Sequence, residues 1–519
     1  MKNQQQQLLN KLTTVTVMAM MFNPGTCTAA AMENSIVPGG VKDKSQAAAL
    51  AEKGTKLDCG KYNVLFIAVD DLRTQLGCYG QKQMLTPNLD RLASTGVMFT
   101  QAYCQQALCS PTRTSLLTGK RPDTTKIYDL TTHFRKTIPD TITLPENFKN
   151  HGYYTVGIGK VYHLNDKQSW DEYIKTTSIT YALPENENYR KDKIQEAKDK
   201  GLKGDKIRTD AERSYAWEAA DVDDNKYHDG QITDKAVEKL REIKNKRFFF
   251  AVGYHKPHLP FCCPKKYWDL YDPAKLKLAD NPYAPKDCPT VALHDSGEVR
   301  RYLGIPKSGP LPDDTARKLI HGYYACTSFL DAQVGRLMKE IEDLKLENDT
   351  IIILWGDHGW QLGEHGLWCK HTNFELATRV PLILRVPGTK NIGVKIPALT
   401  EYVDIYPTLC ELTGLPLPEG LEGVSMVPLL DEPNRDWKSA AFSQYPRPNK
   451  VMGYTMRTKQ YRYAEWKNRD TGEVVGVELY DHQSDPGENV NLALDKKNKD
   501  LCAKLSAQLN AGWKAAKPK

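Results

Sequence analysis

The stretch from Cys109 to Gly119 combines, within a few residues, the groups that a reaction on an anionic substrate needs. It is Cys-Ser-Pro-Thr-Arg-Thr-Ser-Leu-Leu-Thr-Gly. Pro111 suits the first turn of a helix, so we expect Cys109 at a helix N-terminus, where backbone N–H groups and the helix dipole favour an anion. Arg113, about one turn further on, would face the same side. We therefore predict that a negatively charged group meets a reactive atom here.

Carboxylates and an imidazole follow two apolar runs elsewhere in the chain. Asp70 and Asp71 end one run, and Asp357 and His358 end another. Such unbroken runs are typical of strands buried on both faces of a parallel sheet, and ligands gather at the carboxyl ends of these strands. The four side chains could therefore converge on one cation. Carboxylate oxygens favour calcium or magnesium, whereas a softer metal tolerates the imidazole more readily.

Two further segments bring basic side chains after predicted strands. Lys160 and His163 follow one apolar run, and His255 and His258 follow another. On a helical turn Lys160 and His163 would share a face, although such pairs also occur as solvated surface features. Two imidazoles beside a lysine are costly to bury without an anion, so His255 and His258 favour a binding role.

The fold that must position these groups is predicted to be α/β. A chain of 519 residues exceeds what one compact core usually holds, so we expect a large domain with a smaller appendage. Buried strands and an amphipathic helix over 315–344 predict a large mixed, mostly parallel sheet flanked by helices. After a linker near 423–430, further strands and a final helix predict an α+β subdomain. The expected bounds are 60–430 for the catalytic domain and 437–519 for the C-terminal subdomain.

Composition and the N-terminus narrow the partners and the compartment. A net charge of +7 suits an anionic substrate, and without a basic run interleaved with aromatics we expect no nucleic-acid partner. Residues 1–31 carry lysines, an apolar stretch and then Ala29-Ala30-Ala31, which predicts a signal peptide and export to a periplasm or the medium. We expect no transmembrane segment. Twelve cysteines without a Cys-x-x-Cys pair predict neither a disulfide scaffold nor a zinc site.

Together these motifs resemble those of the type I sulfatases, and most closely the iduronate-2-sulfatase-like branch of that family. The resemblance rests on the stretch that begins at Cys109, Gly-Lys-Val-Tyr-His at 159, Gly-Tyr-His-Lys-Pro-His at 253, Gly-Asp-His-Gly-Trp at 356 and Ser-Gln-Tyr-Pro-Arg-Pro at 443. In that family a maturation enzyme oxidises the cysteine to formylglycine (3-oxoalanine). One hydroxyl of the hydrated aldehyde attacks sulfur, and the other later expels the sulfate.

The resemblance also implies residue roles. One calcium ion would be held by Asp70, Asp71, Asp357, His358 and an oxygen of the modified Cys109. Arg113 would steady the ionised hydroxyl of formylglycine. The sulfate oxygens would be held by Lys160, His258 and Lys370. His163 would assist in expelling sulfate, and His258 or a neighbour would protonate the departing sugar oxygen. Many sulfatases carry Asn at the position of His358, and His358 agrees with the iduronate-2-sulfatase-like branch.

The implied substrate is a sulfated carbohydrate, such as a 2-O-sulfated uronic acid of a glycosaminoglycan or an algal polysaccharide. We expect the charged segment 185–224 and the loop after Thr124 to rim the pocket. One alternative is a phosphomonoester or phosphodiester hydrolase of the same alkaline phosphatase superfamily, although no second set of Asp and His ligands for a two-zinc site is evident. The other is a glycan-binding homologue without catalysis, since fold alone never establishes function.

Overall fold

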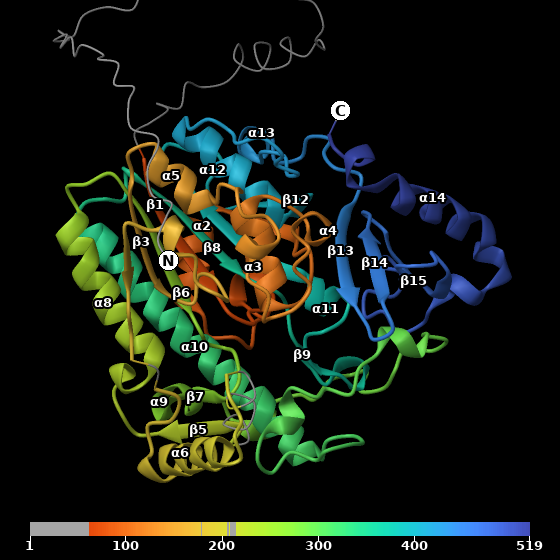
Figure 1. Ribbon diagram of the computed structural model, residues 1–519, viewed down its shortest axis with the longest axis horizontal. Helices are drawn as coiled ribbons and strands as arrows, with labels where there is room; N and C mark the ends of the chain where they lie inside the picture. The colour runs from red at the N-terminus through yellow and green to blue at the C-terminus, as the bar shows by residue number, and fades with distance from the viewer. Residues whose placement is uncertain (1–61, 178, 205–206, 208–213, 519) are drawn as a thin grey trace, which may run out of the picture. The chain divides into compact units, whose positions relative to one another are not determined.

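The computed structural model describes residues 62–177, 179–204, 207 and 214–518, so the predicted signal peptide over 1–31 lies outside the described residues. An eight-stranded sheet in the order β12-β2-β11-β8-β1-β6-β3-β4 forms the centre of the fold (Figure 1). The strands are β1 (Asn63–Val69), β2 (Val97–Tyr103), β3 (Tyr154–Gly159), β4 (Glu172–Ile174), β6 (Phe248–Tyr254), β8 (Thr350–Gly356), β11 (Arg379–Arg385) and β12 (Val394–Glu401).

The sheet is mixed and mostly parallel, which confirms the predicted fold class. Strand β1 pairs in parallel with β6 and β8, and every one of its residues is buried, as its apolar run predicts. Strand β11 is the exception in this sheet, because it is antiparallel to both of its neighbours, β2 and β8. The carboxyl ends of the parallel strands therefore share one edge with the amino end of β11.

Helices cover both faces of the sheet (Figure 1). Alternate residues of β1 supply the two cores: Val64, Phe66 and Ala68 face one, and Leu65, Ile67 and Val69 face the other. Fully burying a Val, Leu, Ile or Phe side chain stabilises the fold by about 1.5–3 kcal/mol. The first core includes residues of α3 (Cys109–Thr118), α5 (Leu144–Asn150) and α12 (Ile405–Thr413), and the second those of α2 (Pro87–Ser94), α8 (His228–Ile243) and α10 (Asp313–Asp343).

The connection from β8 to β11 returns to the edge of the sheet from which it starts. Its two ends are joined by backbone hydrogen bonds from Gly359 N to Ala377 O (2.8 Å) and from Trp360 N to Leu376 O (2.9 Å). A Cβ at Gly359 would lie 1.9 Å from the Leu376 carbonyl oxygen, so only glycine fits there. Residues 357–378 thus form a loop closed at its neck.

A four-stranded antiparallel sheet, β13 (Ala441–Pro446), β14 (Val451–Arg457), β15 (Tyr461–Asn468) and β16 (Val474–Asp481), packs against α14 (Lys499–Ala515) at the C-terminus. Residues 454–466, which read as one strand-like stretch in the sequence, belong to two strands of a hairpin, because a turn that lacks Gly and Pro gives no break in the pattern. The predicted linker contains α13 (Val427–Asp431), with Leu429 fully buried. The division at 430–437 stays a prediction.

The remaining elements are short or peripheral. They are α4 (Pro122–Thr125), α6 (Pro184–Asp199), α9 (Lys265–Trp268), α11 (Glu375–Thr378), β5 (Trp217–Ala220), β7 (Phe261–Pro264), β9 (Gln361–Leu362) and β10 (Trp368–Cys369). None of the described helices combines the length and the apolar composition that a membrane crossing needs. The ten cysteines of the described chain are all free thiols.

Candidate active site

The carboxyl ends of β1 and β8 bring the predicted acidic residues together. Asp70, Asp71 and Asp357 are fully buried. Successive residues of a strand point to opposite faces, but Asp71 has a left-handed backbone with φ of 59°, so both aspartates reach the same site. The Asp71 amide donates to Asp357 Oδ1 at 3.0 Å, and the Tyr323 hydroxyl donates to the Asp71 carbonyl at 2.8 Å. These bonds hold the unusual turn.

Cys109 begins α3, as its sequence predicts, and its sulfur faces this acidic group. Cys109 Sγ lies 3.3 Å from His358 Nε2 and 3.8 Å from Lys160 Nζ. Burial, reinforced by the charge of Asp70, raises the pKa of the Cys109 thiol well above its usual value. The unmodified side chain is therefore a protonated thiol at neutral pH, and a thiol is a poor nucleophile.

Arg113 ties α3 to both strand ends. Its guanidinium is fully buried and bonds to Asp70 Oδ1 at 3.1 Å and Asp357 Oδ2 at 2.9 Å. It also donates to the carbonyls of Lys160 and Val161, and it lies 5.4 Å from the centre of the Trp355 ring. One planar cation therefore fixes the positions of two carboxylates and of the chain that follows β3.

The donor atoms suit a hard divalent cation. One ligand atom each from Asp70, Cys109, Asp357 and His358 lies within 4.8 Å of the others, and Asp71 Oδ1 is 3.4 Å from His358 Nε2. His358 Nδ1 lies 3.1 Å from the Gly359 carbonyl oxygen and can donate to it. The lone pair of Nε2 then points toward this cluster. Carboxylate oxygens dominate the set, so it fits calcium or magnesium. The four predicted acidic and imidazole ligands thus lie together with Cys109.

Each of the two predicted lysines pairs with one of the strand-end aspartates. Lys160 pairs with Asp70, and Lys370 bonds to Asp71 at 2.9 and 3.1 Å. Burial alone would raise the pKa of Asp70, but Lys160 leads the cationic neighbours that hold it well below its usual value. Burial would lower the pKa of Lys370, but Asp71 and then Glu298 raise it well above its usual value. Both ammonium groups are therefore charged at neutral pH.

Glu298 contacts both Lys370 and His258, and the sequence analysis did not identify it. Its Oε1 lies 3.0 Å from Lys370 Nζ and 3.3 Å from His258 Nε2, and its Oε2 lies 3.5 Å from His371 Nε2. Burial opposes ionisation of Glu298, yet Lys370 and the histidines hold its pKa well below the usual value. His258 is also 3.7 Å from Asp71 Oδ2. Burial lowers the pKa of His258, but Asp71, Asp70 and Glu298 together outweigh this effect, so the net shift is upward.

Lys160 and His163 do not lie on a helical turn, because the described chain bends there. Gly159 has φ of 71°, and a Cβ on it would lie 2.1 Å from the Gly253 carbonyl oxygen. That carbonyl accepts the Lys160 amide at 2.8 Å, so the chain turns away from β3 without forming a helix. Both Lys160 and His163 still line the same cavity.

An open cavity of about 950 Å³ lies above Cys109. Its lining includes the predicted side chains Cys109, Lys160, His163, His258 and Lys370. Leu130, which follows Thr124, and Arg190 of α6 also line it, so both expected segments reach the pocket. His255 also lines it, with its Nδ1 3.5 Å from Asp229 Oδ1. A cavity of this size accommodates a sugar larger than one ring.

Fold and site define a hydrolase with the alkaline-phosphatase-like architecture. The profile of the family described as "Sulfatase" matches residues 62–415, and that described as "N-sulphoglucosamine sulphohydrolase, C-terminal" matches residues 363–515. The chain belongs to the sulfatase family, and it is a sulfuric ester hydrolase.

Relatives of known name support this assignment. Human iduronate 2-sulfatase is 36% identical over 515 residues, which cover 85% of this chain and 92% of that protein. A sulfatase of Formosa agariphila is 33% identical and covers 89% of this chain and 90% of its own length. Among solved structures, a "2-O GAG sulfatase" has a TM-score of 0.69 at 23% identity, covering 88% of this chain and 92% of that one. At that identity the match shows the fold alone.

Proposed function

We propose that this enzyme removes a 2-O-sulfate from a uronic acid or similar sugar of a glycosaminoglycan or algal polysaccharide. The carrying observation is the position of Cys109, between a buried carboxylate cluster and the ammonium groups of Lys160 and Lys370 at the base of an open cavity. Its relatives include iduronate 2-sulfatases, which supports the choice of sugar.

Two groups would complete the site. Formylglycine formed from Cys109 by a maturation enzyme would supply a hydrated aldehyde as the nucleophile, which the protonated thiol cannot replace. One calcium ion, held by Asp70, Asp71, Asp357 and His358, would stabilise negative charge at that position.

The chain's own residues then hold the ester and move the protons. Lys160 and Lys370 bind the non-bridging sulfate oxygens and stabilise the charge that develops on them. Arg113 fixes Asp70 and Asp357 and keeps the residue at 109 within reach of sulfur. His258 stands beside Asp71 and Glu298, whose charges keep it protonated, so it can donate a proton to the departing sugar oxygen. His163 assists the later release of sulfate.

The experiment that tests the substrate is a desulfation panel of unsaturated disaccharides. We expect release of sulfate from 2-O-sulfated members, at rates well above those for 4-O- and 6-O-sulfated members. Activity confined to the 4-O or 6-O positions would refute the 2-O assignment. A phosphate monoester and a phosphonate monoester belong in the same panel, since phosphonate monoester hydrolases share the fold at 20–23% identity.

The nucleophile needs its own experiment. Mass spectrometry of the peptide that carries residue 109, made in the native host and trapped with hydrazine, should show an aldehyde. Cys109→Ala should abolish turnover while binding of the disaccharide persists. Turnover by Cys109→Ala would refute the mechanism, and binding without turnover by an unmodified native protein would favour the glycan-binding alternative.

We also propose that the protein is exported to a periplasm or the medium. The proposal rests on the signal-peptide pattern of residues 1–31. N-terminal sequencing of the native protein is the direct measurement, and a start at or before Lys2 would contradict it.

A further inference from the structure

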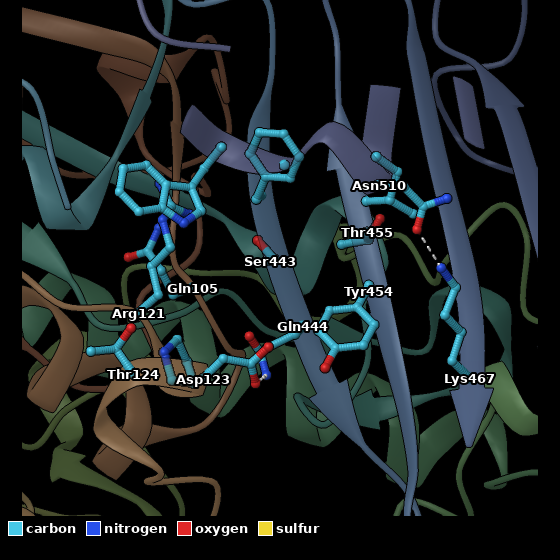
Figure 2. A pocket seen from close by; sticks show the side chains of 15 residues that line it. Gln105, Arg121, Asp123, Thr124, Ser443, Gln444, Tyr454, Thr455, Lys467 and Asn510 are labelled. Atoms are coloured by element: carbon cyan, nitrogen blue, oxygen red, sulfur yellow. Dashed lines mark hydrogen bonds between the residues drawn. The ribbon is translucent and has the colours of Figure 1, made fainter. Parts of the chain in front are cut away.

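A second cavity, of about 290 Å³, lies between α4 with its preceding Arg121 and the C-terminal sheet, and Gln105 adds to its wall (Figure 2). Arg121, Asp123 and Thr124 approach it from one side, and Ser443, Gln444 and Tyr454 approach it from the strands opposite (Figure 2). Its lining shares no residue with that of the catalytic cavity. Strand β13 separates the two, because Gln444 lines this cavity while Tyr445 lines the other.

Gln105 places an amide without partners in the wall of this cavity. The side chain is only 1% exposed, and within the described residues neither its Oε1 nor its Nε2 has a hydrogen-bond partner. Its backbone carbonyl accepts a hydrogen bond from the backbone N–H of Gln444 at 2.8 Å, which ties the Gln105 backbone to β13. Leaving a buried polar group unpaired costs about 1–3 kcal/mol. A ligand that both donates and accepts hydrogen bonds would recover this cost.

Aromatic rings form much of the remaining wall. Phe442, Tyr454 and Trp513 line the cavity, and Trp513 lies 5.1 Å from the Arg121 guanidinium carbon. Trp513 reaches this position because α14 is interrupted at Gly512, where φ is 72° and ψ is −176°. Flat apolar faces beside fixed amide and hydroxyl groups are typical of sites for ligands with both C–H faces and hydroxyl groups.

The charges of the cavity disfavour an anion. Both guanidinium NH groups of Arg121 bind Glu401, at 2.7 and 2.8 Å, and Lys467 pairs with Glu465 at 2.6 Å. Asp123 accepts hydrogen bonds from the Tyr128 hydroxyl and from Gln444 Nε2, each at 2.9 Å. No cation of the described chain forms an ion pair with Asp123. A sulfate group placed beside Asp123 would therefore be repelled, whereas a ligand hydroxyl could donate to this carboxylate.

From these observations we propose that the second cavity is a binding site for a neutral, unsulfated sugar residue. Its volume fits a single pyranose ring, the half-buried Tyr454 ring offers a stacking face, and Gln105 and Asp123 offer partners for hydroxyl groups. The site is independent of the reaction at Cys109, and a sugar chain bound there would hold the enzyme on a polymer that carries unsulfated units.

The test uses direct binding to the full chain, so it does not depend on turnover. The probes are the methyl pyranosides of glucose, galactose, xylose and N-acetylglucosamine, followed by saturation-transfer NMR and isothermal titration. We expect saturable binding of at least one probe at millimolar concentration. Tyr454→Ala and Gln105→Leu should each raise its Kd at least about tenfold, whereas Tyr283→Ala, at a ring that is 58% exposed, should not change it.

Further controls separate this site from the catalytic cavity. Cys109→Ala should bind the probe as the wild type does, and glucose 6-sulfate should bind Cys109→Ala at the second cavity more weakly than glucose does. Absence of saturable binding of every probe would overturn the proposal. So would a Kd that neither Tyr454→Ala nor Gln105→Leu changes while both variants keep the wild-type circular dichroism spectrum.

Discussion

Replacement of Lys438 is predicted to lower the free energy of unfolding strongly, because its ammonium group neutralises two buried carboxylates. Its ammonium group is 4% exposed and bonds to Glu401 Oε2 at 2.8 Å and to both oxygens of Asp404 at 2.6 Å. Arg121 also binds Glu401, so two cations balance two anions. The cluster joins the end of β12 to the segment before β13.

Lys438→Met keeps most of the side-chain volume but leaves the cluster with one unpaired negative charge. Removing one partner from a buried ion pair costs about 3–5 kcal/mol. An exposed pair contributes about 0–1 kcal/mol. Lys450→Met is the matched control, since Lys450 pairs with Asp470 where both side chains are more than half exposed.

The assay is urea unfolding followed by tryptophan fluorescence and far-UV circular dichroism, with thermal unfolding in parallel. We expect Lys438→Met to lose about 3–5 kcal/mol, and Lys450→Met to remain within about 0.5 kcal/mol of the wild type. Neutralising the excess anion in Lys438→Met/Asp404→Asn should cost less than the sum of the two single variants. A Lys438→Met protein as stable as Lys450→Met would refute the reasoning.

Three further predictions concern the site and the pH dependence of stability. Glu298→Gln keeps the shape but removes the charge that holds Lys370 and His258, so kcat/KM should fall about 10- to 100-fold, while Lys370 keeps its ion pair with Asp71 and the variant stays folded at the assay temperature; a variant with wild-type kinetics would exclude this positioning role. Chelation followed by calcium should lower and then restore the melting temperature by mass action, and Asp357→Asn should abolish the response; a response retained by Asp357→Asn would contradict the ligand assignment. Burial raises the pKa of Asp331 to about 6, although it accepts hydrogen bonds from the amides of Asn88 and Leu89. The folded state therefore binds the proton more tightly than the unfolded state. As the pH rises from about 4 to about 6, the free energy of unfolding should fall by up to about 3 kcal/mol. In Asp331→Asn this part of the slope should disappear, and a pH titration of unfolding that shows no difference would contradict the assignment.

The sequence predicts the strand-end residues well because a buried strand leaves a strong signal. The apolar runs before Asp70 and Asp357 locate both strands, and chemistry at the carboxyl ends of a parallel sheet follows from the architecture. Pro111 and Gly119 likewise mark the bounds of α3. Local physics sets these features, so they can be inferred without tertiary contacts.

Features that depend on distant contacts could not be inferred in the same way. Glu298 lies in a long segment without periodicity, and only its contacts with Lys370 and His258 reveal it. The bend after β3 depends on the close approach of Gly159 and Gly253, which are far apart in the sequence. The reversed direction of β11 leaves no mark in its composition, because a buried antiparallel strand is as apolar as a parallel one.

That single reversed strand has a consequence for how the enzyme can change. The loop over 357–378 leaves and re-enters the sheet at one edge and is closed at Gly359. Asp357, His358 and Lys370 therefore all lie on one continuous segment of the chain. An insertion or deletion inside the closed part would displace Lys370 relative to Asp357 and His358, which lie on the sheet side of the neck. Substrate preference can diverge through the pocket lining at Leu130 and Arg190, whereas this segment can be exchanged between relatives only as a whole.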